Sequence, residues 1–571
     1  MRIGAALQRL AFRLLRPPPS EPKCNGVRAG MRRLRPAGIL AVTGAAWLAC
    51  GAAARAQGVL PATGVDTRVG DLRGYFAQAF GQVVPPEGGT HGWTYSAGLD
   101  VSETYDTDVP LNTANNRQAH DLITRITPSI GVTGDSSRLS GSLFYSPSLN
   151  IYAFHGNQNS VGQNLNAAAT AVVVPDFFFV DVRAFAAEQA ISGFNGPNGT
   201  TDVSSSNQEL TTSFSISPSL RHSFGSVADA ALSYTLSRTA FDANSQVATS
   251  TAQAVNQNYT SQAVNGSLGT GADFGQFNDV ATVQLSQSTG TGALSGAHSD
   301  VFTDTLSYAA TRSLTATGSI GHEDYSYGGT NAYAVNDLTW SGGLIWTPNP
   351  DSNVSIGYGH QQGNSSFYLN ATYAATENTR VYARYSQGVG TEAQNLQTAV
   401  NSSTVNSFGV TVDRITGQPV SPNNNFFVTQ TGVFRTTSGS ISAVLLHPRD
   451  LYNVSLQYQE TTQLTGGAAG VPGSSGSTTG GYGSVAWTHD LSDDLHANAL
   501  VQYGINNNSN SGVGATNQSG SSFLVNAGLS YSISDSLSLS AQYTLTTGAS
   551  GFGTNTGVRQ IAIVSIHKTF F

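Results

Sequence analysis

The side chains of this sequence that could do chemistry are scattered, and they form no recognisable catalytic set. The sequence has no Gly-x-Ser-x-Gly elbow, no His-Glu-x-x-His pair and no phosphate loop with Gly-Lys-Ser/Thr. Six histidines stand singly, and we expect them to be polar lumen, turn or interface residues: His155, His322, His360, His447, His489 and His496. We therefore expect that the chain is not an enzyme and holds no cofactor or metal.

One acidic group is a candidate cation site. Glu103, Asp106 and Asp108 stand close together where we expect the first outer loop to begin. A solvated acidic loop is the favoured interpretation, because residues 57–571 carry 16 basic against 33 acidic residues. The same excess of negative charge argues against nucleic acid as a partner.

Polar side chains at alternate strand positions form the remaining candidate set. If the apolar positions face lipid, these positions face a lumen: Arg125, Asp181, Arg183, Arg221, Arg380, Arg384, Gln457, Gln459, Asn498 and Gln502. Arginine forks could line a path for hydrated or anionic saccharide chains. The other interpretation is that the arginines only balance acids within a wall that must be polar anyway.

The elements that must position this set are strands. From Trp93 onward apolar residues recur with a period of two, most clearly over 495–503, 523–531 and 537–545. About 22 such segments follow one another, and most are as long as a tilted membrane crossing requires. Tyrosines and tryptophans near the expected strand ends are typical of the interface girdles of a barrel.

The connections between these segments alternate in length. Every second link is a tight turn, such as Pro175-Asp176 or Glu377-Asn378, and the others are mostly long and rich in Asn, Gly and Ser, such as 192–208 and 389–432. Short periplasmic turns and long extracellular loops are typical of outer-membrane barrels. The last segment, Gly557–Phe571, is expected to pair with the first strand, and its terminal Phe571 to be recognised by the barrel-assembly machinery.

The first 56 residues have a different composition. An Arg-rich start at Met31, an apolar run and Ala54-Arg55-Ala56 predict a signal peptide cleaved before Gln57, and Met31 is a candidate true start. A lipoprotein site at Cys50 is the alternative, but Trp47 stands where leucine is preferred. Residues 57–92 are expected to be a short periplasmic leader, and residues 93–571 the transmembrane barrel.

Several stretches resemble a known family. The run from Thr104 to Phe154, the stretch VVVPDFFFVDVRAFAAEQ, Ser313 to Tyr327 and Asp337 to Gly359 are similar to the outer-membrane β-barrels associated with exopolysaccharide and exosortase (PEP-CTERM) gene clusters. Where such proteins often carry an Asp-Asn pair, this sequence has Asp106-Thr107-Asp108. The resemblance implies a porin-like barrel linked to polysaccharide export, with export-cluster proteins and polysaccharide as partners.

We therefore predict an all-β fold, an up-and-down antiparallel barrel in the lipid of the bacterial outer membrane. The expected function is porin-like, in exopolysaccharide export or general solute passage. The alternative is a structural or adhesive barrel that displays loops 389–432 and 461–478 without conducting. A TonB-dependent receptor also has 22 strands, but its plug needs about a hundred residues, and only about 36 separate the predicted cleavage site from Trp93.

Overall fold

The computed structural model describes ten ranges of the chain. They are 92–110, 118–190, 208–243, 258–328, 333–405, 411–413, 432–465, 475–511, 518–548 and 558–570. All of them belong to one compact unit, Thr43–Phe571. The predicted signal peptide, most of the predicted leader and Phe571 lie outside the described residues, as do parts of the predicted long loops.

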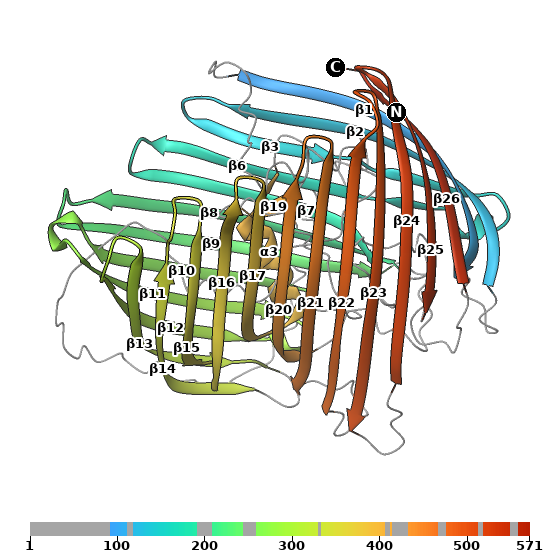
Figure 1. Ribbon diagram of the computed structural model, residues 1–571. Coiled ribbons are helices and arrows are strands. Elements are labelled where there is room, and N and C mark those ends of the chain that lie inside the picture. Colours follow the sequence, from blue (N-terminus) through green and yellow to red (C-terminus); the bar gives the residue numbers. More distant parts are fainter. Residues whose placement is uncertain are drawn as a thin grey trace, which may run out of the picture. The chain divides into compact units, whose positions relative to one another are not determined.

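Antiparallel strands make up nearly all of this part (Figure 1). The first half of the sheet contains β1 (Gly92–Pro110), β2 (Gln118–Asp135), β3 (Leu139–Tyr145), β4 (Ser148–Tyr152), β5 (Ser160–Gly162), β6 (Asn164–Val174), β7 (Phe178–Ala190), β8 (Gln208–Ser223), β9 (Ala228–Ala243), β10 (Tyr259–Thr270), β11 (Phe277–Gly290) and β12 (His298–Ala309). The second half contains β13 (Leu314–Ser326), β14 (Ala334–Trp346), β15 (Asn353–Gln361), β16 (Asn364–Thr376), β17 (Thr379–Gly390), β20 (Val433–Leu446), β21 (Asp450–Thr465), β22 (Ser475–Asp490), β23 (Leu495–Ser511), β24 (Gln518–Ser534), β25 (Leu537–Gly548) and β26 (Val558–Thr569).

Four of these segments combine into two barrel strands. β2 pairs with β3 over one half of its length and with β4 over the other, and β6 and β5 continue the sheet beyond them. The break falls at Ser146-Pro147, because proline has no N–H to donate to the ladder. The sheet therefore has 22 barrel strands, as the sequence predicts.

The barrel closes between its first and last strands. β26 pairs with β1 from Gly98↔Thr569 to Asp106↔Ile561. Closure leaves no strand edge with unpaired N–H and C=O groups, which a hydrocarbon environment would not tolerate. The predicted pairing of the last strand with the first is confirmed.

Two-residue alternation gives the wall an apolar outward face. Leu338, Trp340 and Leu344 on β14 are half-exposed, while Thr339 between them is buried. A closed barrel with such a face belongs in the outer membrane, which confirms the predicted location. Among the described residues, no helix is long and apolar enough to cross a membrane, a finding that does not bear on strands.

Short connections gather at one end of the barrel, which is the periplasmic end. Most lie where the sequence predicts them, and Asp176 in the predicted Pro175-Asp176 turn has a φ of 58°. The turn predicted at Gln276–Asn278 starts earlier, because the 3-10 helix η4 (Ala272–Phe274) occupies the link. At the opposite, extracellular end, β15 and β16 meet in a tight turn through Gln362 and Gly363, whose φ angles are 52° and 67°.

Candidate functional site

The extracellular half of the lumen contains a helix where the sequence predicts only a loop. α3 (Glu392–Ser402) follows β17 directly and is enclosed by the strands (Figure 1). It lies against β7, β8 and β9 on the opposite wall. β18 (Ser403–Val405) continues from it, pairs with β19 (Thr411–Asp413) and lies against β3 and β6. The prediction that 389–432 is a surface loop is therefore wrong for its first part.

Local chemistry explains why a helix begins here. The Thr391 hydroxyl accepts from the backbone N–H of Gln394 at 3.2 Å, and the Gln394 side chain accepts from the backbone N–H of Thr391 at 3.0 Å. This reciprocal pair is a capping box, which satisfies two backbone donors at the helix start. Ala393, Leu396 and Val400 then recur at helical spacing and are buried.

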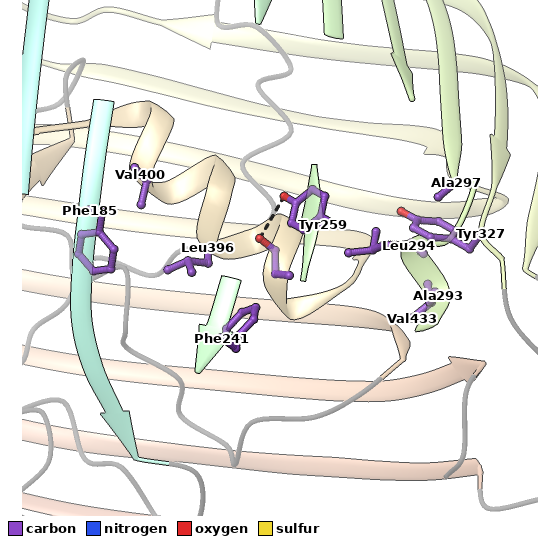
Figure 2. Packing of buried hydrophobic residues seen from close by; sticks show 12 residues of the cluster. Phe185, Phe241, Tyr259, Ala293, Leu294, Ala297, Tyr327, Leu396, Val400 and Val433 are labelled. Atoms are coloured by element: carbon purple, nitrogen blue, oxygen red, sulfur yellow. Dashed lines mark hydrogen bonds between the residues drawn. The ribbon is translucent and has the colours of Figure 1, made fainter. Parts of the chain in front are cut away.

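Hydrogen bonds hold α3 to the opposite wall. The side-chain oxygen of Gln397 accepts from the hydroxyl of Ser213 in β8 at 2.8 Å and from that of Thr239 in β9 at 2.6 Å. All three residues are at least 95% buried. The hydroxyl of Tyr259 in β10 donates to the carbonyl of Ala393 at 3.3 Å (Figure 2).

An apolar cluster surrounds these bonds, and we call it the outer-lumen cluster. α3 contributes one side of it, and strand ends and a 3-10 helix, η5 (Gly292–Leu294), contribute the rest (Figure 2). Its members are Phe185, Phe241, Tyr259, Ala293, Leu294, Ala297, Tyr327, Val389, Ala393, Leu396, Val400 and Val433. Most stand near extracellular strand ends, so the lumen is narrowed at that end.

The turn between β15 and β16 binds the chain just before α3. The side-chain oxygen of Gln362 accepts from the backbone N–H of Val389 at 2.7 Å, and its amide group donates to the Val389 carbonyl at 3.4 Å. Gln362 is 6% exposed. The chain is therefore held on the β15–β17 side just before α3 begins, and on the β8–β10 side by α3 itself.

The ten predicted lumen residues all lie on inward strand positions. Alternation with exposed apolar neighbours shows this for Arg125, Asp181, Arg183, Arg221, Arg380, Arg384, Gln457, Gln459, Asn498 and Gln502. They are distributed around the wall and do not converge on one point. That they line the path of a solute stays a prediction.

Their contacts differ from one residue to the next. Arg380 pairs with Asp351 at 3.3 Å, as the charge-balance interpretation expects. The Arg125 Nε donates to Asn150 at 2.7 Å, and Asp181 accepts from Thr170 at 2.6 Å. The Arg221 guanidinium lies 5.0 Å from the centre of the Phe179 ring. Arg183, Gln457 and Gln502 are at most 7% exposed.

The candidate cation site does not bring Glu103 and Asp106 together, because they lie on opposite faces of β1, and the Asp108 side chain is outside the described part of the structure. Asp106 is 1% exposed and binds Arg559 of the closing strand, with Nη2–Oδ2 at 2.5 Å. Glu103 lies on the outward face and accepts from Thr124 at 2.6 Å. Within the described ranges no three potential ligands cluster around a common point. The solvated acidic loop is wrong for Asp106, because barrel closure buries it beside an arginine far away in sequence.

Several of the single histidines have aspartate partners. His155 lies 2.8 Å from the buried Asp121, and His360 lies 2.9 Å from Asp337. His489 and His496 make equivalent contacts of 2.8 Å with Asp450 and Asp490. All four pairs stand near strand ends. Asp490 follows His489 directly in β22, so the last two pairs are neighbours, but successive side chains of a strand point to opposite faces of the wall.

Comparison with known proteins identifies solved barrels only. No family model and no curated protein matches the chain. The FrpB iron transporter from Neisseria meningitidis is 9% identical, with 83% of this chain and 81% of that chain covered and a TM-score of 0.47. The ferric-catecholate import receptor Fiu from E. coli K12 is 11% identical, with coverages of 83% and 81% and a TM-score of 0.44. The ferric enterobactin receptor PfeA from Pseudomonas aeruginosa, in a mutant form, is 10% identical, with coverages of 84% and 81% and a TM-score of 0.38.

These comparisons correct the predicted function. The three similar barrels are named as an iron transporter, a ferric enterobactin receptor and a ferric-catecholate import receptor, and none of them is named as a porin, a polysaccharide exporter or an adhesin. The porin-like conduit for exopolysaccharide or general solutes is therefore wrong, and so is the adhesive alternative. The family resemblance holds for the outer-membrane barrel and not for the exopolysaccharide association. The names include no enzyme, in agreement with the prediction that this chain is not one.

Proposed function

We propose that this chain is a ligand-selective uptake barrel of the outer membrane, in which α3 narrows the path of the ligand. The observation that carries the proposal is the anchoring of Gln397 to Ser213 and Thr239 across the lumen. General passage needs an open lumen. A helix held at both walls instead restricts passage to a ligand that fits beside it or displaces it.

The inward wall favours an anionic, oxygen-rich ligand. Arg125, Arg183, Arg221 and Arg384 stand on inward positions among serine, asparagine and glutamine side chains. Guanidinium forks bind carboxylate and similar oxygens with paired hydrogen bonds, and hydroxyl and carboxamide groups complement them. Iron, ferric enterobactin and ferric catecholates are what the similar barrels are named for, and at TM-scores below 0.5 that likeness does not identify the ligand of this chain.

Conductance of the purified full chain in planar bilayers tests the narrowing. We expect low steady conductance for the wild type and higher conductance for Gln397→Ala, because that variant removes the acceptor shared by Ser213 and Thr239. Thr398→Ala is the matched control, since among the described residues the Thr398 hydroxyl donates to the Gln394 carbonyl of its own helix and to no wall residue. Wild-type steps as large as those of a variant without residues 392–402 would overturn the proposal.

Titration calorimetry tests the ligand class with citrate as an oxygen-rich anion and glucose as a neutral probe. We expect citrate to bind more tightly than glucose, and Arg384→Gln to weaken citrate binding by at least threefold. Equal binding of the two probes would contradict the anionic class while leaving the conductance result to decide the narrowing itself.

A further inference from the structure

Two carboxyl groups lie on the outward face of the barrel, within the apolar band. Asp304 in β12 stands between Phe302 and Leu306, which are 51% and 50% exposed. Asp279 in β11 stands two positions after Phe277, which is 52% exposed. Side chains two positions apart in a strand share a face, so both aspartates point toward the surroundings of the barrel.

Contact with acyl chains would be costly for this pair. The Asp279 and Asp304 side chains are diagonal neighbours on this face, since Asp279 pairs with Leu306 and Asp304 pairs with Ala281. An ionised carboxylate on a lipid-facing position destabilises a barrel. Ionisable groups at membrane depth generally mark a contact with protein or water.

A second acidic pair continues this face toward the extracellular end. Asp300 in β12 and Asp324 in β13 are directly opposite in register. Like charges at opposite positions destabilise a sheet unless a cation compensates them. His298 lies 3.8 Å from Asp324, at the edge of ion-pair distance. His322 also stands on this face, two positions from Asp324, so the compensating groups close to the pair in the described part of the chain are imidazoles, which are cations only when protonated.

Two glycines lie side by side on the outward face of β13 and β14. Gly318 and Gly342 are opposite in register, and a Cβ atom added to Gly342 would meet nothing within 4 Å. Leu306, Ile320 and Tyr358 project around them and are 50%, 57% and 39% exposed. Small residues beside projecting ones let two membrane proteins approach closely.

A basic residue lies on the outward face of β9, which is three strands away from β12. Arg238 pairs with Phe214, which is 42% exposed, so the two residues share the outward face. Its guanidinium contacts the Thr260 hydroxyl at 3.5 Å. Within the described residues it makes no ion pair.

Depth decides which residues of two copies can meet. Copies related by an axis along the membrane normal contact each other at equal depth. Strands inclined by roughly 40° and about 4.8 Å apart shift a row of paired residues by about one residue per strand. The direction of this shift follows from the aromatic residues near the periplasmic end, which mark one depth in the membrane. Tyr308 in β12 shares a row of paired residues with Leu344 in β14, whereas the aromatic residue of β14 is Trp346, two positions nearer the periplasm.

This shift brings Arg238 to the depth of the upper acidic pair. Arg238 pairs with Thr260 in β10, and Thr260 pairs with Thr289 in β11. Thr289 stands two positions beyond Gln287, which pairs with His298 in β12. A shift of about one residue per strand over the three steps from β9 to β12 then places the depth of Arg238 between His298 and Asp300. Arg238 and Asp300 thus lie at about the same depth, three strands apart.

We propose that the outward face of β9 to β13 binds a second copy of this chain. A twofold axis near β10 and β11 places Arg238 of each copy against Asp300 and Asp324 of the other, so each ion pair occurs twice. The Asp279 and Asp304 carboxyl groups then face protein instead of acyl chains. The partner proposed for this face is a second barrel, and a face covered by lipid alone is the alternative outcome of the experiment.

Sedimentation of the purified full chain in density-matched detergent measures the association. We expect a wild-type dimer, and at least tenfold weaker association for Arg238→Asp and for the double variant Asp300→Arg/Asp324→Arg. Combining all three substitutions restores the ion pairs with reversed polarity, so association returns to within about threefold of wild type. Glu103→Arg, an outward change on β1, is the control and leaves association unchanged.

Resistance of each variant to unfolding in cold SDS confirms that the barrel has formed before sedimentation is interpreted. A conservative variant, Asp279→Asn/Asp304→Asn, removes ionisation without adding bulk and is expected to keep the dimer. A chain that stays monomeric at every concentration in detergent, and a cysteine variant at the outward Leu285 of β11 that does not cross-link in membranes, would overturn the proposal. Equal association of Arg238→Asp and wild type would overturn it too.

Discussion

Replacement of Arg559 by alanine should open the seam of the barrel. Arg559 on β26 donates from Nε to both carboxylate oxygens of Asp106 at 3.0 and 3.2 Å, and from Nη2 to Oδ2 at 2.5 Å. Asp106 is 1% exposed and is paired in register with Asp121, which is fully buried. Arg559→Ala therefore leaves two buried carboxylates opposite each other.

The magnitude follows from that burial. Removing one partner of a buried ion pair costs about 3–5 kcal/mol, because an uncompensated charge remains. The double variant Asp106→Ala/Arg559→Ala removes that charge, so it should cost only about 1–2 kcal/mol, the value of lost hydrogen bonds. Arg380→Ala is the control: its partner Asp351 is 68% exposed, so this pair is worth at most about 1 kcal/mol.

Guanidinium unfolding of the full chain in detergent, followed by tryptophan fluorescence, measures these free energies. The expected order of stability is wild type, then Arg380→Ala, then the double variant, then Arg559→Ala. If Arg559→Ala were as stable as Arg380→Ala, or if the double variant were no more stable than Arg559→Ala, the seam would not depend on this ion pair.

Two further predictions concern the wall and the start of the inner segment. Gly321→Ala should destabilise the barrel by at least about 1–3 kcal/mol, since the added Cβ would collide with the Phe302 carbonyl oxygen of β12. The control is Gly439→Ala, whose Cβ would lie 3.5 Å from its nearest neighbour, and it should change stability little in the same unfolding assay. Gln362→Gly keeps the positive φ of the β15–β16 turn but loses both hydrogen bonds to Val389, so bilayer conductance should rise while the unfolding midpoint stays close to wild type.

The wall of the barrel was predictable because a two-residue period is a local property of sequence. Strands β23, β24 and β25 cover 495–503, 523–531 and 537–545, the segments where the alternation is clearest. The inward positions follow from the same period, which is why the ten lumen residues lie on the inward face. Pro147 interrupts one predicted strand, because a missing N–H breaks the ladder without changing the alternation.

The contents of the lumen were not predicted, although part of the signal was present. Thr391 and Gln394 form a capping-box pattern ahead of Leu396 and Val400, at helical spacing, inside a segment interpreted as a loop from its composition. The partners of Gln397 are 158 and 184 residues away in sequence. Only the closed wall brings them within reach, so no local pattern could identify the anchoring.

Asp106 and Asp304 show that two-residue alternation predicts the face on which a side chain lies but not its partner. Alternation places one aspartate inside the barrel and the other outside, and both burial beside apolar groups and exposure to acyl chains would destabilise an isolated carboxylate. Closure of the barrel brings Arg559 to Asp106, so the chain itself supplies that counter-ion. For Asp304 the neighbouring acid on the same face is Asp279, so the described strands beside it supply a second carboxyl group and no counter-ion. The physical requirement is the same at both sites, and at the outward site the proposed second barrel would meet it by replacing acyl chains with protein.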